Sequence, residues 1–104
     1  MAINFSLILP CYNEELNIIH LYEEFKNIPD NNIKKELIFV NNGSTDKTEE
    51  NIDKVIYQSN IEKNSNLIIK KLNLSRNQGY GGGIKAGLDI AQGDYIGWTH
   101  ADLQ

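Results

Sequence analysis

The chain has 104 residues, 40% of them apolar and 23% charged, which fits one compact domain or the front part of a larger one. Fourteen acidic against ten basic residues give a net charge of −4, and the lysines are scattered along the sequence, so nucleic acid is excluded as a partner. A lone cysteine, the absence of a basic leader and the lack of an apolar run near the roughly 20 residues that cross a bilayer make the cytoplasm the expected compartment.

The first third of the sequence predicts a strand followed by a helix. Phe5 to Leu9 form a short apolar run, which Pro10 is expected to stop. The helical pattern that follows has one apolar stripe, made of Leu16, Ile19 and Tyr22 beside Ile18, Phe25 and Ile28.

The same order of elements occurs a second time. Leu37 to Val40 form a buried-strand run, and the next helix is expected to open with Asp46 as its N-cap and Glu49 as the partner residue of a capping box. The buried face of this helix is predicted to be Ile52, Val55 and Ile56.

The last third repeats the strand and helix once more and adds a final strand. Residues 67–74 read as a strand, and a polar, glycine-rich loop leads from it into a helix that Gly93 is expected to stop. The residues expected on the buried face of this helix are Ile84, Leu88 and Ala91. Residues 95–99 are the fourth predicted strand.

Strands that alternate with helices, each strand a continuous apolar run, predict an α/β fold of Rossmann-like type with a mostly parallel sheet flanked by helices. The whole chain, residues 1–104, is expected to form a single domain. Ligands of such sheets bind at the carboxyl ends of the strands. Every unusual polar cluster of the sequence falls there, in residues 10–14, 41–46, 75–83 and 100–104.

The first cluster suits a nucleobase. Pro10 provides a rigid turn, Tyr12 an aromatic face for stacking, and Glu14 a carboxylate that accepts a ring N–H. The simpler alternative is a turn and a helix start, in which Asn13 caps the helix.

The second and third clusters suit polar and phosphate groups. Asn41 and Asn42 bring side-chain amides to a strand end, although Asn-Gly is also an ordinary tight turn. The glycines of the third cluster let backbone N–H groups approach a phosphate. They also match a dinucleotide fingerprint at Gly81, Gly83 and Ala86, but that fingerprint belongs directly after a strand, which is not its place here.

The fourth cluster suits a divalent metal ion. If the strand continues, His100, Asp102 and Gln104 project on one face and offer an imidazole, a carboxylate and an amide to one point. Oxygen ligands favour Mg²⁺ or Mn²⁺, and the imidazole favours Mn²⁺. The alternative is a polar loop with a surface histidine.

Taken together, the four clusters resemble the family 2 inverting glycosyltransferases of the GT-A fold, in particular their dolichyl-phosphate mannose synthase-like branch. Residues 9–15 are similar to the family's nucleobase-binding signature, and residues 41–46 to its Asp-Asp-Gly-Ser-Thr-Asp segment, with asparagine in place of both leading acids. Residues 77–88 resemble the segment and helix that lie under the diphosphate. Residues 100–104 resemble the metal-binding Asp-Ala-Asp-Leu-Gln motif, with His100 in place of its first acid.

The resemblance implies a set of binding residues. Those expected to bind the nucleotide sugar are Pro10, Tyr12, Asn13, Glu14, Asn41, Asn42, Gly79, Gly81, Ala101 and Asp102. Those expected to bind the metal, Mn²⁺ or Mg²⁺, are His100, Asp102 and Gln104.

The resemblance also implies a reaction, in which a polyprenyl phosphate or cell-envelope glycan acceptor attacks a UDP- or GDP-sugar with inversion. The general base is expected beyond Gln104. The chain therefore reads as the front half of a catalytic domain that binds nucleotide without efficient turnover. Its longer parent is expected in the cytoplasm or at the cytoplasmic face of a membrane.

Three other functions stay open from the sequence. The glycine fingerprint allows an NAD(P)-dependent oxidoreductase, and the replaced acids at positions 41, 42 and 100 allow a non-catalytic nucleotide-binding module. A cysteine hydrolase would pair Cys11 with His20 or His100. An exposed edge of the sheet is further expected to support a homo-oligomer.

Overall fold

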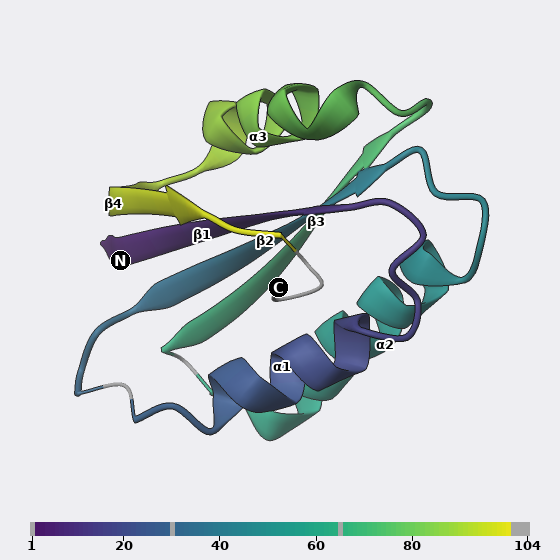
Figure 1. Ribbon diagram of the computed structural model, residues 1–104. Helices are drawn as coiled ribbons and strands as arrows, with labels where there is room; N and C mark the ends of the chain where they lie inside the picture. Colours follow the sequence, from purple (N-terminus) through teal and green to yellow (C-terminus); the bar gives the residue numbers. More distant parts are fainter. Residues whose placement is uncertain (1, 30, 65, 101–104) are drawn as a thin grey trace.

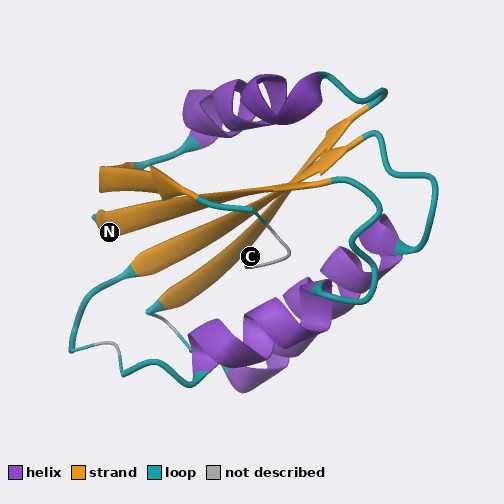
Figure 2. Cartoon of the chain, in the orientation of Figure 1, coloured by secondary structure: helices purple, strands orange, loops and turns teal. Residues whose placement is uncertain are grey.

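The computed structural model describes residues 2–29, 31–64 and 66–100. Strands and helices alternate in this part of the chain: β1 (Ile3–Cys11), α1 (Ile18–Lys26), β2 (Lys35–Asn42), α2 (Thr48–Glu62), β3 (Leu67–Leu74), α3 (Gly79–Ile90) and β4 (Gly93–Trp98). The strands form one sheet in the order β3-β2-β1-β4, and each neighbouring pair is parallel. The helices α1 and α2 lie together on one face and α3 on the other (Figures 1 and 2), which confirms the predicted α/β class.

The strand β1 lies at the point where the order of the sheet reverses. The chain moves outward from β1 to β2 and β3 on one side, and then crosses back to place β4 on the other side (Figure 1). In open α/β sheets ligands bind outside the carboxyl ends of the strands at such a reversal. The end of β1 is therefore the first place to examine for a site.

Pro10 was expected to stop the first strand, but β1 continues through it to Cys11. Pairing with β4 ends at Ile8, whose carbonyl accepts a bond from the N–H of Thr99. Successive residues of a strand direct their backbone groups to alternate sides. Pro10 comes two residues after Ile8, so its backbone nitrogen faces the β4 side of β1. Pairing with β4 has already ended at that point. The missing donor costs no ladder bond there.

Two apolar layers hold the helices to the sheet, because side chains alternate along each strand. Leu7 and Leu9 face α1 and α2 and belong to the larger layer. Ile8 faces α3, and Ile38 and Val40 from β2 join it in the smaller layer. The sheet is thus covered on both faces, as the continuous apolar runs predict.

The predicted apolar stripe of the first helix is right for Ile18, Tyr22 and Phe25 and wrong for Leu16, Ile19 and Ile28. The helix begins only at Ile18, so Leu16 precedes it and is 89% exposed, and Ile19 is 45% exposed. The residues that face the sheet are Ile18, Leu21 and Tyr22. None of the helices in the described part of the chain has the length and apolar content that crossing a membrane requires.

The start of α2 differs from the predicted capping box. The helix begins at Thr48, with Lys47 in the N-cap position, and the Asp46 Oδ1 atom accepts the Thr48 N–H at 2.9 Å. The Asp46 side chain therefore still accepts a hydrogen bond from a backbone N–H at the start of the helix, although Asp46 lies one residue before the N-cap position. The Glu49 carboxylate turns away from Asp46 and bonds to Lys71 of β3 at 2.9 Å. The buried face is as predicted, with Ile52 and Val55 buried and Ile56 partly buried.

The helix α3 begins at Gly79, inside the segment expected to be a loop. Its fully buried residues are two glycines, Gly83 and Gly87, and Ala86 and Ile90 pack beside them on the smaller layer. Of the residues expected on the buried face, Ala91 packs there as well, whereas Leu88 is 41% exposed. A Cβ atom on Gly87 would lie 2.5 Å from the Ile8 Cγ2 atom of β1. The helix backbone can rest on the strand only because this side chain is absent.

We expect Gly87→Ala to destabilise the protein by about 1–3 kcal/mol, because the added methyl must displace Ile8 from a packed layer. Gly81→Ala is the matched control, since a Cβ there meets nothing within 4 Å and alanine favours a helix by up to about 1 kcal/mol. Urea unfolding followed by circular dichroism measures both. Equal unfolding midpoints for the two variants would contradict the close approach.

A buried carboxylate, Glu36, ties the opposite end of the sheet together. Its Oε1 atom accepts bonds from the Ser6 hydroxyl and from the Gln92 N–H, each at 2.8 Å, and its Oε2 atom lies 2.6 Å from the Lys70 Nζ atom. The Ser6 hydroxyl in turn accepts the Gly93 N–H at 2.8 Å. Gly93, expected to stop the preceding helix, is instead the first residue of β4. One side chain thus joins three strands to the turn between α3 and β4.

Glu36→Gln is expected to lower the free energy of unfolding by about 2 kcal/mol at pH 7, because a charged acceptor is lost. Burial alone would raise the pKa of Glu36, but the bonds from Lys70, Gln92 and Ser6 outweigh it and hold the pKa below its ordinary 4.5. The stabilisation is therefore complete above the unfolded-state pKa and is lost as the pH falls through the folded-state value. Urea titrations should show a constant difference from pH 6 to 8 that closes below about pH 4.5. A difference that widened in acid would contradict this role.

Candidate functional site

A cavity of about 250 Å³ opens at the carboxyl end of β1. Residues from the ends of β1 and β2, from the start of α3 and from the segment after β4 line it together. The lining residues are Pro10, Cys11, Tyr12, Glu14, Asn42, Asn77, Gly79, Tyr80 and His100. The structure therefore brings members of all four polar clusters of the sequence to one hollow.

Several residues expected in the site do not line this cavity. Asn13 connects two of the loops around it, Asn41 bonds to Asn73 of β3 and lines a different hollow, and Gly81 lies in the first turn of α3. The remaining expected binding and metal residues, Ala101, Asp102 and Gln104, lie outside the described residues.

Asn13 fastens the loop after β1 to the loop after β2. Its backbone has a φ of 52°, and its N–H donates to the Ser44 hydroxyl at 3.0 Å. Its side-chain oxygen accepts the Thr45 N–H at 2.8 Å. One residue further on, the Glu14 N–H donates to the Thr48 Oγ1 atom at 2.9 Å. Asn13 thus fixes the loop that carries Tyr12 and does not cap α1 itself.

Tyr12 and Glu14 give the cavity an aromatic and an anionic wall. Tyr12 is 48% exposed, which makes its aromatic side chain available for stacking. One carboxylate oxygen of Glu14 accepts a bond from the Asn17 side chain at 2.7 Å, which orients the carboxylate. Its other oxygen can accept a ring N–H.

Asn41 faces the opposite side of the sheet from its neighbour Asn42. Its Nδ2 atom donates to the Asn73 Oδ1 atom of β3 at 3.0 Å, and its own oxygen accepts the Ser44 N–H at 3.3 Å. It lines a separate hollow of about 440 Å³, together with Glu49 and polar residues that follow β2 and β3. An amide oxygen has two lone pairs, so this atom can accept one more bond.

Asn42 is 3% exposed and reaches the start of α3. Its Oδ1 atom accepts the Gln78 N–H at 2.9 Å, and its Nδ2 atom donates to the Gly79 carbonyl at 2.8 Å. Gly79 also donates its N–H to the Asn77 side chain at 2.7 Å. Two asparagines therefore hold the turn that leads into α3.

An aromatic stack closes one side of the cavity. The rings of Tyr80 and His100 lie with centroids 4.1 Å apart and planes 19° from parallel. Stacking occupies a face of the imidazole and leaves its two nitrogens at the ring edge, where a proton or a metal ion can reach them. This orientation is compatible with the expected role of His100 as a metal ligand. The described residues contain no group of three histidine, cysteine or acidic side chains that would hold a metal by themselves.

The set of binding residues expected from the sequence does not include Tyr80 or Asn77, although both line the cavity. Both lie in the third polar cluster, whose glycines are its most conspicuous feature. The spacing of Asn77 two residues before Gly79 was a usable signal, because an asparagine side chain commonly bonds to the backbone two residues on.

Cys11 is not suited to act as a nucleophile. Its side chain is fully buried, and its thiol lies 3.1 Å from the Leu9 carbonyl. Burial, together with the nearby Glu14 carboxylate, raises the pKa of the Cys11 thiol far above its ordinary value. The protonated thiol is unreactive, which rules out the cysteine-hydrolase alternative.

Cys11 should accordingly react with an aromatic disulfide reagent only when the protein unfolds. We expect the absorbance of the released thiolate to rise at least about a hundredfold more slowly in buffer at pH 8 than in concentrated urea, because few molecules expose the thiol. Rapid labelling of the folded protein would contradict the burial of this side chain.

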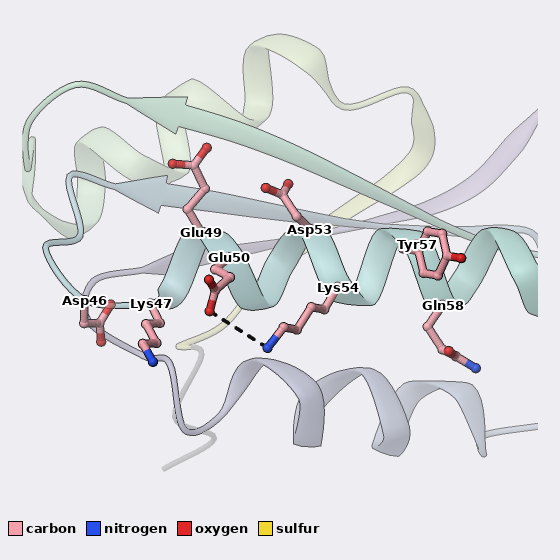
Figure 3. Close-up of a pocket in the computed structure, with 8 residues that line it drawn as sticks. All are labelled: Asp46, Lys47, Glu49, Glu50, Asp53, Lys54, Tyr57 and Gln58. Atoms are coloured by element: carbon pink, nitrogen blue, oxygen red, sulfur yellow. Dashed lines mark ion pairs between the residues drawn. The ribbon is translucent and has the colours of Figure 1, made fainter.

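A larger hollow, of about 810 Å³, lies elsewhere, along the outer face of α2 (Figure 3). All its lining residues come from α2 or from the two residues before it. Its ion pair joins Glu50 and Lys54 at 3.9 Å, and both side chains are about 60% exposed. This is a solvated helix face, without groups that converge from other elements as they do at the strand ends.

The glycine fingerprint does not have the geometry of a dinucleotide site. Gly81 and Gly83 lie inside α3, and the strand before them is β3, at the edge of the sheet. The fingerprint requires a tight turn directly after the central first strand. The oxidoreductase alternative therefore loses its structural basis.

The fold and the site together define a doubly covered parallel α/β domain of the kind that forms the N-terminal part of GT-A enzymes, with its polar cavity at the strand ends. Residues 6–104 match the family described as Glycosyl transferase family 2. The chain belongs to this family.

Relatives and solved structures agree with this assignment. The chain is 42% identical to an uncharacterized glycosyltransferase, sll0501, of Synechocystis, over 100% of this chain and 31% of that protein. It is 33% identical to the dolichol-phosphate mannosyltransferase of Saccharomyces cerevisiae, over 100% of this chain and 37% of that protein. It thus spans about a third of the length of these relatives.

Two solved structures share the fold. The crystal structure of S. aureus TarS in complex with UDP-GlcNAc superposes with a TM-score of 0.75 at 27% identity, over 96% of this chain and 27% of that one. The mannosyltransferase PcManGT of Pyrobaculum calidifontis, in complex with GDP-Man and Mn²⁺, gives 0.77 at 21% identity, over 98% and 28%.

Proposed function

We propose that this chain supplies the nucleotide-sugar-binding part of an enzyme that transfers a sugar, with inversion, from a UDP- or GDP-sugar to a polyprenyl phosphate or cell-envelope glycan. The observation that carries the proposal is the cavity at the end of β1, to which all four polar clusters contribute. Family membership and the UDP-GlcNAc bound to TarS support a nucleotide-sugar donor.

The base of the donor is assigned to the loop after β1. Tyr12 offers a ring face and Glu14 a free carboxylate oxygen, and Asn13 holds both in place through Ser44 and Thr45. The acceptor oxygen that Asn41 keeps is a further candidate for a base N–H.

The diphosphate is assigned to the start of α3, where Gly79 and Gly81 keep the backbone accessible. Asp102 and Gln104 are proposed to hold Mn²⁺ or Mg²⁺ with His100, and Ala101 to lie against the donor. Such a metal, when bound, stabilises the negative charge on the departing diphosphate.

The acceptor and the general base complete the proposed reaction. Relatives named as dolichyl- and undecaprenyl-phosphate sugar transferases support a lipid-phosphate acceptor. The base is proposed to lie beyond Gln104, so residues 1–104 alone should bind nucleotide without efficient transfer. A location at the cytoplasmic face of a membrane and pairing of copies through a sheet edge remain predictions.

Calorimetric titration of the protein with UDP and GDP, each with Mn²⁺ and with excess chelator, tests the donor. We expect one of the two diphosphates to bind, with affinity at least about tenfold higher when the metal is present, because the metal shares the diphosphate charge. The preferred diphosphate identifies the nucleobase of the donor.

NADH serves as the negative control in the same titration. Metal-independent binding of NADH in place of UDP or GDP would contradict the proposal. His100→Asp examines the non-catalytic alternative: if this change is needed before a longer form of the protein transfers sugar, the natural chain is a binding module.

A further inference from the structure

Both polar atoms of the Asn42 side-chain amide are hydrogen-bonded, one as an acceptor and the other as a donor. Its oxygen accepts the Gln78 N–H at 2.9 Å, and its nitrogen donates to the Gly79 carbonyl at 2.8 Å. The side chain is 3% exposed, so water cannot replace either partner. It is therefore committed to the protein backbone and is not a free contact for a ligand.

Only an amide satisfies this pair of partners at neutral pH. A carboxylate can accept from Gln78 but has no proton for Gly79, and it would place a negative charge 2.8 Å from a carbonyl oxygen. Position 42 matches the second acid of the segment that this chain resembles. The asparagine is thus a change with a structural consequence, since it adds a donor that closes a second bond.

The two bonds fix the junction between the Asn77 turn and α3. Gln78 occupies the N-cap position of α3, and Gly79, with a φ of +80°, is its first residue. From the other side, a Cβ atom on Gly83 would lie 3.2 Å from the Asn42 Nδ2 atom. The start of the helix is consequently held against the end of β2 by hydrogen bonds at residues 78 and 79 and by close contact at Gly83.

We propose that Asn42 is a positioning residue that holds the start of α3 as a preformed wall for the donor diphosphate; this inference rests on the proposed function. The base-binding loop is fastened separately. Asn13 bonds to Ser44 and Thr45, and Glu14 to Thr48, and none of these bonds passes through Asn42. Loss of the Asn42 donor should therefore weaken contacts with the diphosphate and spare contacts with the base.

The first experiment examines the free protein by amide hydrogen exchange at residues 78–82. Asn42→Asp keeps the shape and the acceptor and removes the donor, and Asn42→Ala removes both without adding charge. Asn60→Asp, at an exposed position of α2, is the control for the added charge. We expect exchange at least about tenfold faster in both Asn42 variants, with no change in Asn60→Asp. Unchanged exchange in both Asn42 variants would overturn the inference.

The second experiment compares a nucleoside diphosphate with its nucleoside, UDP with uridine and GDP with guanosine, by NMR titration in Mg²⁺. We expect Asn42→Asp and the uncharged Asn42→Ala both to bind the diphosphate at least about tenfold more weakly and the nucleoside within about twofold of the original affinity. A loss confined to Asn42→Asp would be charge repulsion and would overturn the positioning role. A merely structural loss would weaken both equally, and that result would overturn the positioning role.

Unchanged diphosphate binding would overturn the positioning role as well. If the unaltered protein binds neither diphosphate, the proposed function fails together with the ligand part of this inference. The exchange measurement then still decides whether Asn42 holds the start of α3.

Discussion

The close contact between α3 and β1 determines the geometry of the site. Because Gly87 has no side chain, the helix backbone rests directly on Ile8, and Gly83 does the same at Pro10. The start of the helix is thereby brought to the carboxyl ends of β1 and β2. Tyr80 reaches the cavity from there, and its ring meets His100 from the segment after β4. A bulkier residue on this side of α3 would move one wall of the cavity away from the others.

The cavity is lined mostly by neutral groups. Amides, aromatic rings and glycine backbone line it, and Glu14 is its one carboxylate among the described residues, while no lysine or arginine is among its lining residues. A diphosphate placed there gains backbone and amide bonds but little charge neutralisation. Positive charge therefore has to come from groups other than the lining residues, and this is the reason for expecting a metal ion to strengthen diphosphate binding.

The sheet could be predicted from the sequence far better than the helices that cover it. Buried parallel strands are continuous apolar runs, and the run of residues 67–74 coincides with β3. The first helix was placed two residues too early, because Leu16 continues its apolar pattern although it precedes the helix and is exposed. The third helix was missed at its start, since a run of glycines resembles a loop when the strand against which they pack is unknown.

The polar strand ends were correctly expected to meet, since parallel strands bring them to one edge. The separate roles of Asn13, Asn41 and Asn42 could not be predicted from their spacing, because the sequence shows only three asparagines near strand ends. Only their partners separate them: Asn13 joins two loops, Asn41 faces Asn73, and Asn42 holds a helix start.

Pro10 has a consequence for what can ever lie next to β1. If β4 continued pairing with β1 toward the carboxyl edge, it would need an N–H donor two residues beyond Ile8. That residue is Pro10, and proline has no N–H to give. Extension of the sheet into this region would therefore leave one backbone carbonyl of β4 without its donor from β1. The same proline also lines the cavity, so the sequence discourages backbone pairing at the place where the cavity opens.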